Sequence, residues 1–263
     1  MNRRSAYDRD CLARANGRPT AASFIRNVTT EFIEMHGDRR YSDDAAVLAG
    51  IARLDGRPVT VIGLEKGVDL QDRMRHNFGS AHPEGYRKAL RQMQLAEKFR
   101  RPVICFVDTS GAFCGVGAEE RGQGQAIAEN LMAMSALNTP IITVVIGEGG
   151  SGGALALAVA DEVWMLENAI YSVISPEGAA SILWKDASRT RESSECLKLT
   201  ARDLKKFGVV ERVFREGGDW NKVYGELKSL LTKTLKRYAA MDREALLNHR
   251  YEKFRRIGRL SRA

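Results

Sequence analysis

The chain has 263 residues, of which 44% are hydrophobic and 28% charged, and its formal net charge is +8 at pH 7. This composition is typical of a soluble globular protein with a substantial core, and no apolar run approaches the roughly 20 residues of a membrane span, so we expect a cytoplasmic protein. The positive charge fits an acidic partner (nucleic acid, anionic lipid or a phosphorylated small molecule) and fits equally a basic surface without a specific partner.

The first third of the chain predicts an arm, a helix and a hairpin. Residues 1–19 are polar and arginine-rich, and we expect a loose arm there. Phe24, Val28 and Phe32 recur at helical spacing and predict an amphipathic helix that closes at a His-Gly-Asp sequence. Two apolar runs joined by an Asp-Gly pair then predict a β-hairpin over 47–64.

The rest of the chain alternates between strands and helices after a polar loop over 66–79. Proline suits a first helical turn, so a helix is predicted over 83–99. Further strands are predicted over 103–107, 141–146, 163–166, 170–174 and 209–214, and further helices over 119–137, 154–160, 176–184 and after Thr200. This alternation predicts an α/β domain over 20–216 with parallel pairing, and 217–263 predicts a charged helical tail.

Cysteine and histidine spacing argues against a metal site in this chain. The four cysteines are widely spaced and contain no C-x-x-C pair: Cys11, Cys105, Cys114 and Cys196. Such spacing argues against a zinc ribbon and is typical of a reducing compartment. The histidines show no metal-ligand spacing either.

Two glycine-rich loops each follow a strand and precede a helix. In 147–153 five of seven residues are glycine. Glycine permits positive φ and close approach, and the first turn of a helix offers free N–H groups and the positive end of its dipole. The sequence therefore predicts a site for a phosphate or an oxyanion. The other loop, 108–117, should border the same cavity, because ligands bind beyond the carboxyl ends of parallel strands.

Nucleotide-binding motifs do not account for these glycines. Gly115 and Gly117 resemble the start of a dinucleotide fingerprint, but Glu120 takes the third glycine position. No G-K-[ST] sequence follows any glycine run, so a P-loop is absent. Lys66 and Arg87 are among several cations that precede the loops, and they fit a phosphate-bearing ligand or a solvated surface.

A nucleophile elbow is the sharpest competing hypothesis. Gly149-x-Ser151-x-Gly153 matches its pattern in the correct strand-to-helix context. The only later histidine, however, is His249 in the charged tail, and the flanking glycines favour close approach of a ligand over a strained serine. A serine esterase and a purely structural glycine turn both remain open at this point.

Eight segments of the chain match the pattern of a single protein family: 36–39, 77–79, 83–89, 117–123, 147–154, 171–178, 182–187 and 197–201. They follow one another in order over roughly 21–215 and are more specific than any single glycine pattern. In these segments the chain resembles the carboxyltransferase α subunit of bacterial acetyl-coenzyme A carboxylase.

The resemblance implies a crotonase (ClpP-like) fold, a superhelix of ββα units. It implies transfer of a carboxyl group from carboxybiotin, on the biotin carboxyl carrier protein, to acetyl-CoA, which gives malonyl-CoA for fatty-acid biosynthesis. The implied partners are a β subunit, in an α2β2 assembly, and biotin carboxylase. The β subunit would supply most of the acyl-CoA side and the zinc ribbon, and neither a membrane nor a specific nucleic acid is expected.

For this chemistry we hypothesise roles for residues in and near the two loops. Gly152 and Gly153 would donate backbone N–H groups to the ureido oxygen of biotin, and Gly149 and Gly150 would give clearance. The facing wall would consist of Gly111, Ala112 and Phe113, and substrate contacts would come from Lys66 and Arg87. The alternatives are a crotonase-type acyl-CoA hydratase or isomerase, an esterase that uses Ser151, and a non-catalytic subunit.

One of the loops departs from the family pattern. Where the family usually has D-T-P-G-A-Y-P-G, residues 108–115 are D-T-S-G-A-F-C-G. The two missing prolines leave the unfolded loop more conformational freedom, and Phe113 lacks a tyrosine hydroxyl. These changes would suit a specialised paralogue.

Overall fold

One eight-stranded sheet organises the chain, in the order β1-β2-β3-β4-β5-β6-β8 with β7 paired to β5. The structure is a computed structural model that describes residues 4–259. The strands are β1 (Thr30–Glu34), β2 (Val47–Leu54), β3 (Arg57–Leu64), β4 (Val103–Thr109), β5 (Ile141–Gly150), β6 (Glu162–Leu166), β7 (Ile170–Ser172) and β8 (Arg212–Phe214). All pairs from β3 to β8 are parallel, as predicted, and β1 to β3 form an antiparallel edge.

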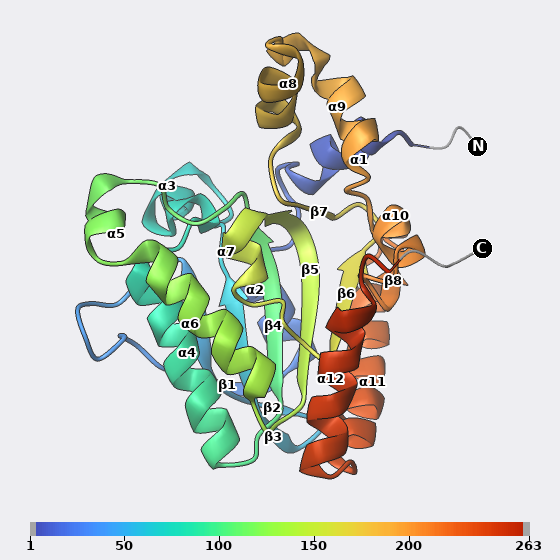
Figure 1. The fold of residues 1–263 in the computed structure, drawn as a ribbon. Coiled ribbons are helices and arrows are strands. Elements are labelled where there is room, and N and C mark those ends of the chain that lie inside the picture. The colour runs from blue at the N-terminus through green and yellow to red at the C-terminus, as the bar shows by residue number, and fades with distance from the viewer. Residues whose placement is uncertain (1–3, 260–263) are drawn as a thin grey trace.

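Helices cover both faces of this sheet (Figure 1). The longer ones are α1 (Ala6–Ala13), α2 (Ala21–Val28), α4 (Pro83–Lys98), α6 (Gln123–Ala136), α8 (Pro176–Trp184), α9 (Thr190–Leu197), α11 (Trp220–Ala239) and α12 (Arg243–Arg256). The shorter ones are α3 (Leu70–Arg75), α5 (Val116–Glu120), α7 (Ser151–Leu155) and α10 (Ala201–Lys206). Helix α4 packs on β2 and β3 and on α6, whereas α2 packs on β3 and β4 and on α11.

The core lies along the central strands. Every residue of β4 is buried, and so is β5 up to Gly149, because helices cover these strands on both sides. Leu227 and Leu231 of α11 are fully buried in the same core. The predicted charged tail is helical, and its apolar side is part of the main core.

The predicted loose arm is wrong for the residues that the structure describes. Ser5 caps α1 through a reciprocal pair of hydrogen bonds with Asp8. Arg18 donates to the carbonyl oxygen of Ile146 at 2.8 Å and pairs with Glu216 at 2.7 Å. Sequence patterns miss this docking because its partners lie more than a hundred residues away.

Four other segments differ from the prediction. Helix α2 ends at Val28, and Phe32 belongs to β1, because the chain becomes extended at the C-cap residue Thr29, with φ −120° and ψ 172°. The predicted loop 66–79 contains α3, which is capped by Asp69. The helix predicted over 119–137 is split into α5 and α6 at Gly122, whose φ is 81°. Helix α9 lies in a segment for which no helix was predicted.

Candidate functional site

The glycine turn joins β5 to the short helix α7, and only glycine fits at two of its positions. A Cβ on Gly153 would stand 2.5 Å from the backbone nitrogen of Ala112. A Cβ on Gly150 would overlap the carbonyl oxygen of Ser110. The turn and the facing loop are therefore in close backbone contact, which confirms that both glycine loops lie at one place. Gly152 differs, since its nearest neighbour, Ile127 Cγ2, would be 3.8 Å from an added Cβ.

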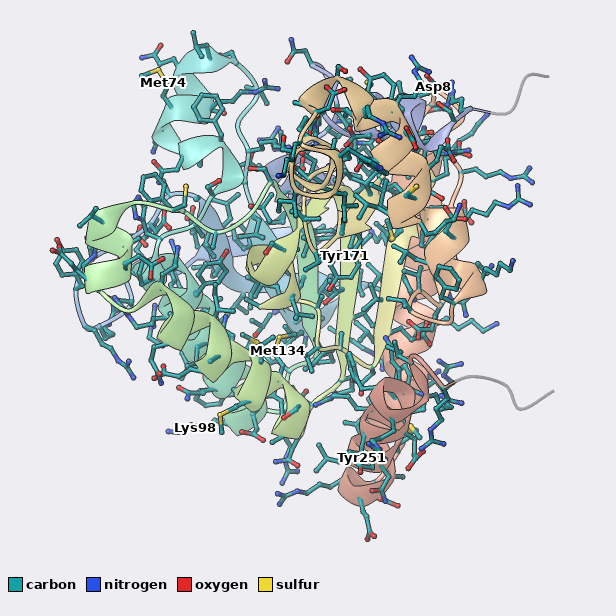
Figure 2. All side chains as sticks on the ribbon, turned by 45° about the horizontal axis from the view of Figure 1, so that its top comes forward. Asp8, Met74, Lys98, Met134, Tyr171 and Tyr251 are labelled. Atoms are coloured by element: carbon teal, nitrogen blue, oxygen red, sulfur yellow. The ribbon has the colours of Figure 1, made fainter. Side chains whose placement is uncertain are left out.

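No side chain caps α7 at Gly150. The N–H groups of its first turn, which include those of Gly152 and Gly153, thus have no side-chain acceptor. Gly149 is constrained from the other side, because an added Cβ would stand 2.9 Å from Tyr171 Cδ2. Figure 2 shows Tyr171 near the centre of the view.

The facing loop is held firmly although it lacks the two prolines. Thr109 Oγ1 accepts a hydrogen bond from Gly111 N at 3.1 Å and donates one to Gly111 O at 2.8 Å. Phe113 N donates to Ala81 O at 3.0 Å, and Gln123 Nε2 donates to Phe113 O at 2.9 Å. Side-chain hydrogen bonds therefore fix the wall that prolines would otherwise make rigid.

A charged network lies directly beneath the turn. Lys66 Nζ forms ion pairs with Glu148 and, at 3.2 Å, with Asp108. Burial disfavours the charged form of Lys66, but Asp108 and Glu148 outweigh it and raise its pKa. Burial raises the pKa of Asp108, against the opposing effect of Lys66. A cavity of about 250 Å³ opens here, lined by Arg14, Lys66, Arg73, Phe78, Ser110 and Glu148.

The two cations that were predicted to contact substrate are both engaged by the protein itself. Lys66 is held by its two carboxylates, as above. Arg87 Nε lies 2.7 Å from Asp38 Oδ2, and Arg87 Nη1 donates to the carbonyl oxygen of Arg121 at 2.9 Å. The structure brings Lys66 next to the glycine turn, whereas Arg87 ties α4 to the segments around it.

Ser151 has the backbone of an elbow, with a φ of 52°, although the flanking glycines favoured an unstrained residue. Its side chain is exposed. His249 lies on α12, where its ring is 3.4 Å from Tyr238 Oη, and that pair borders a different cavity. Among residues 4–259 no hydrogen bond links Ser151 Oγ to a base, and the ring of His249 faces Tyr238.

Comparison with known proteins decides what this site belongs to. A family model described as acetyl co-enzyme A carboxylase carboxyltransferase-like matches residues 2–258. The acetyl-coenzyme A carboxylase carboxyl transferase subunit alpha of Ruminiclostridium cellulolyticum is 62% identical over 98% of this chain and 99% of its own length. That of Streptococcus thermophilus is 56% identical over 93% of this chain and 96% of its own. The chain belongs to the acetyl-coenzyme A carboxylase carboxyltransferase α-subunit family.

Solved structures show the fold of this carboxyltransferase α subunit. Transcarboxylase 12S matches with a TM-score of 0.69 at 21% identity, over 84% of this chain and 42% of that chain. A Pseudomonas malonate decarboxylase hetero-tetramer matches with a TM-score of 0.65 at 18% identity, over 82% and 88% of the two chains. The fold is the crotonase fold, as the sequence resemblance implied.

Two further findings bear on what this α subunit holds. Within residues 4–259, no three His, Cys, Asp or Glu side chains are grouped so that they could bind a metal ion. None of the helices described is both long and apolar enough to cross a bilayer.

The sequence analysis missed one component of the site, Arg14, whose guanidinium lies 2.8 Å from Glu148 and 2.8 Å from Glu177. No local pattern could have identified it.

Proposed function

We propose that this α subunit, with a β subunit, transfers a carboxyl group from carboxybiotin on a separate carrier protein to acetyl-CoA, which gives malonyl-CoA. The observation that carries the proposal is the glycine turn. Gly150 and Gly153 leave no room for a side chain against the loop 110–112, and the first-turn N–H groups of α7 have no side-chain cap.

The residues of the turn fit the group that would react there. When bound, biotin supplies the transferable carboxyl group, and negative charge develops on its ureido oxygen. The N–H groups of Gly152 and Gly153 are the donors suited to that oxygen, and such donors stabilise an oxyanion by about 3 kcal/mol each. Gly149 and Gly150 keep side chains out of the approach, and Gly111, Ala112 and Phe113 form the opposite wall. No side-chain nucleophile is required, so Ser151 needs no histidine.

A β partner is supported by the surface and by a relative. Three large apolar side chains on α8 or just before it are exposed: Val173 (78%), Ile182 (70%) and Leu183 (62%). Ile182 and Leu183 are neighbours on α8, and exposed apolar side chains that lie together are typical of protein interfaces. In Figure 1, α8 projects beyond the sheet at the end where α7 lies. A Natranaerobius thermophilus protein named as subunits beta/alpha is 55% identical over 96% of this chain, which spans 43% of its length.

The remaining components follow from the resemblance to the α-subunit family. We assign the zinc ribbon to the β chain, in an α2β2 complex, and the supply of carboxybiotin to biotin carboxylase and the carrier protein. All four cysteines are free thiols, which supports the reducing cytoplasm as the location of the complex.

The test is co-purification of the chain with a β subunit, followed by malonyl-CoA-dependent carboxylation of free biotin. We expect a stable complex that carboxylates biotin, and neither chain alone should do so. A chain that hydrates an enoyl-CoA without biotin or a β subunit would contradict the proposal.

A further inference from the structure

Glu148 stands on β5 two residues before Gly150, and cations hold its carboxylate from two sides. Lys66, which follows β3, contacts one carboxylate oxygen, Oε2. Arg14, at the end of α1, places Nε 2.8 Å from the other oxygen, Oε1. The side chain of Glu148 is only 9% exposed and that of Lys66 14%, so their ion pair is largely shielded from water, whereas the Arg14 side chain is 33% exposed. Figure 2 shows α1, which carries Asp8, and α3, which carries Met74 and follows Lys66, on opposite sides of this end of the molecule.

The backbone of the same residue is fixed by Asp108. Glu148 N donates to Asp108 Oδ1 at 2.8 Å, and a Cβ on Gly147 would overlap that carboxylate. The pairing of β4 with β5 shifts register between Val107 and Thr109, directly beside this contact. Such irregularities re-aim the end of a strand. Here the strand end leads into the glycine turn, so its direction sets the direction of the first N–H groups of α7.

Arg14 extends this arrangement to another element. Its Nη1 lies 2.8 Å from Glu177 Oε1 in the first turn of α8, and its Nη2 lies 3.1 Å from Asp10 Oδ1. One guanidinium therefore joins α1, the end of β5 and the start of α8. Removing it would leave the carboxylate of Glu148 with one partner only, and a buried charge that loses a partner is strongly destabilised.

We propose that Glu148 is a positioning residue for carboxyl transfer. Held between Lys66 and Arg14, it fixes the end of β5 and thereby the orientation of the N–H groups of Gly152 and Gly153. Through Arg14, the N-terminal helix α1 becomes part of the reaction machinery. The part of this inference that concerns kcat rests on the function proposed above.

In this arrangement Lys66 supports Glu148, and it differs from a substrate-binding residue in its expected kinetics. Lys66 is already paired with two carboxylates and its side chain is 14% exposed, so its charge is balanced within the protein. A substrate contact would change KM when removed. A positioning group would instead lower kcat with little change in KM, because small misplacements at a reacting centre reduce the rate strongly.

The experiment uses the wild-type α–β complex and three variants of the α chain, Glu148→Gln, Arg14→Met and Lys66→Met, with Lys66→Arg as the conservative rescue. Arg9→Met is the matched control, since Arg9 lies on the same helix but bonds to Asn168 at 2.9 Å and to the Glu167 carbonyl. We expect kcat for malonyl-CoA-dependent biotin carboxylation to fall about 10- to 100-fold in the three variants, with KM within about twofold. Lys66→Arg should recover most of the loss, and Arg9→Met should match the wild type.

A second readout does not depend on activity. Amide hydrogen exchange over 149–153 should become faster in Glu148→Gln and Arg14→Met, and it should stay unchanged in Arg9→Met. Unchanged exchange together with a wild-type kcat in Arg14→Met would overturn the inference, as would a rise in KM at constant kcat in Lys66→Met. If the wild-type complex does not carboxylate biotin, the proposed function fails, and the exchange measurement still decides whether Glu148 positions the turn.

Discussion

Arg14 and Glu148 are 134 residues apart in the sequence, yet Arg14 Nε lies 2.8 Å from Glu148 Oε1. The contact joins the N-terminal helix to the strand that enters the glycine turn. The N-terminal segment, which was expected to be a loose arm, therefore supports the site through Arg14.

This contact predicts non-additive effects on the rate. Because Arg14 acts on the turn through Glu148, the double variant Arg14→Met, Glu148→Gln should lose no more activity than the more severe single variant. Residues in direct contact typically show coupling energies of about 0.5–3 kcal/mol, whereas independent sites add. The measurement is a double-mutant cycle on kcat with the α–β complex. Strictly multiplicative losses would show that the two residues act separately.

Asp10 gives the N-terminal helix a predicted pH dependence. Burial raises the pKa of Asp10 from 3.8 to about 6, against the opposing effect of Arg14. Because the folded chain binds this proton more tightly than the unfolded chain, the contribution of Asp10 to stability is complete below about pH 3.8 and is lost as the pH rises through about 6.

The variant Asp10→Asn carries no charge at any pH and should remove this loss. The difference in free energy of unfolding between Asp10→Asn and the wild type should increase by up to about 3 kcal/mol from pH 4 to pH 7.5. This value follows from about 1.4 kcal/mol per pKa unit. Denaturant unfolding at the two pH values measures the change. If the free energy of unfolding changes equally with pH in both proteins, Asp10 is not the source of the pH dependence.

The C-terminal helix α12 is predicted to be essential for stability through one buried ion pair. Arg250 Nε lies 2.9 Å from Asp161 Oδ1, and their side chains are 1% and 0% exposed. Arg250 also donates to the carbonyl oxygens of Met134 and Leu137.

Replacing Arg250 by methionine should cost about 3–5 kcal/mol, because it leaves the Asp161 carboxylate buried without its partner. Arg255→Met, at an exposed position of the same helix, should change stability by less than about 0.5 kcal/mol. Urea unfolding of the two variants gives the comparison. Equal effects would mean that α12 is held by its apolar contacts alone.

Ser151 is predicted to be dispensable for chemistry. Ser151→Ala should keep kcat within about twofold, because the proposed reaction uses the backbone N–H groups of Gly152 and Gly153, which do not depend on the Ser151 side chain. Carboxylation of biotin by the α–β complex is the assay. A fluorophosphonate probe provides the counter-test, and covalent labelling of Ser151 would instead favour the esterase.

The features that the sequence predicts correctly are those with a local cause. Asp55 and Gly56 adopt φ values of 50° and 74°, which a two-residue hairpin turn requires, so the Asp-Gly pair suffices to identify the hairpin. The buried strands β4 and β5 follow from short β-branched runs. The glycine turn follows from its composition, and the resemblance to the α-subunit family assigned its chemistry.

The features that the sequence does not predict depend on distant partners. Phe32 continues a helical period but lies on β1, because pairing with β2 outweighs that period. Arg14 and Arg250 look like ordinary surface charges in the sequence. Only the fold brings them to Glu148 and Asp161, which is why the predicted site lacked its support and the tail looked separate.

The central claim is that backbone N–H groups of the glycine turn drive carboxyl transfer, and the pair Gly153→Val and Gly152→Ala tests it most directly. A side chain at Gly153 would meet the backbone nitrogen of Ala112 at 2.5 Å, whereas the nearest atom to a Cβ at Gly152 is 3.8 Å away. In malonyl-CoA-dependent carboxylation of biotin by the purified α–β complex, Gly153→Val should lose at least about 100-fold in kcat while the complex stays assembled. Gly152→Ala should stay within about tenfold of the wild type. Full activity in Gly153→Val would contradict the account.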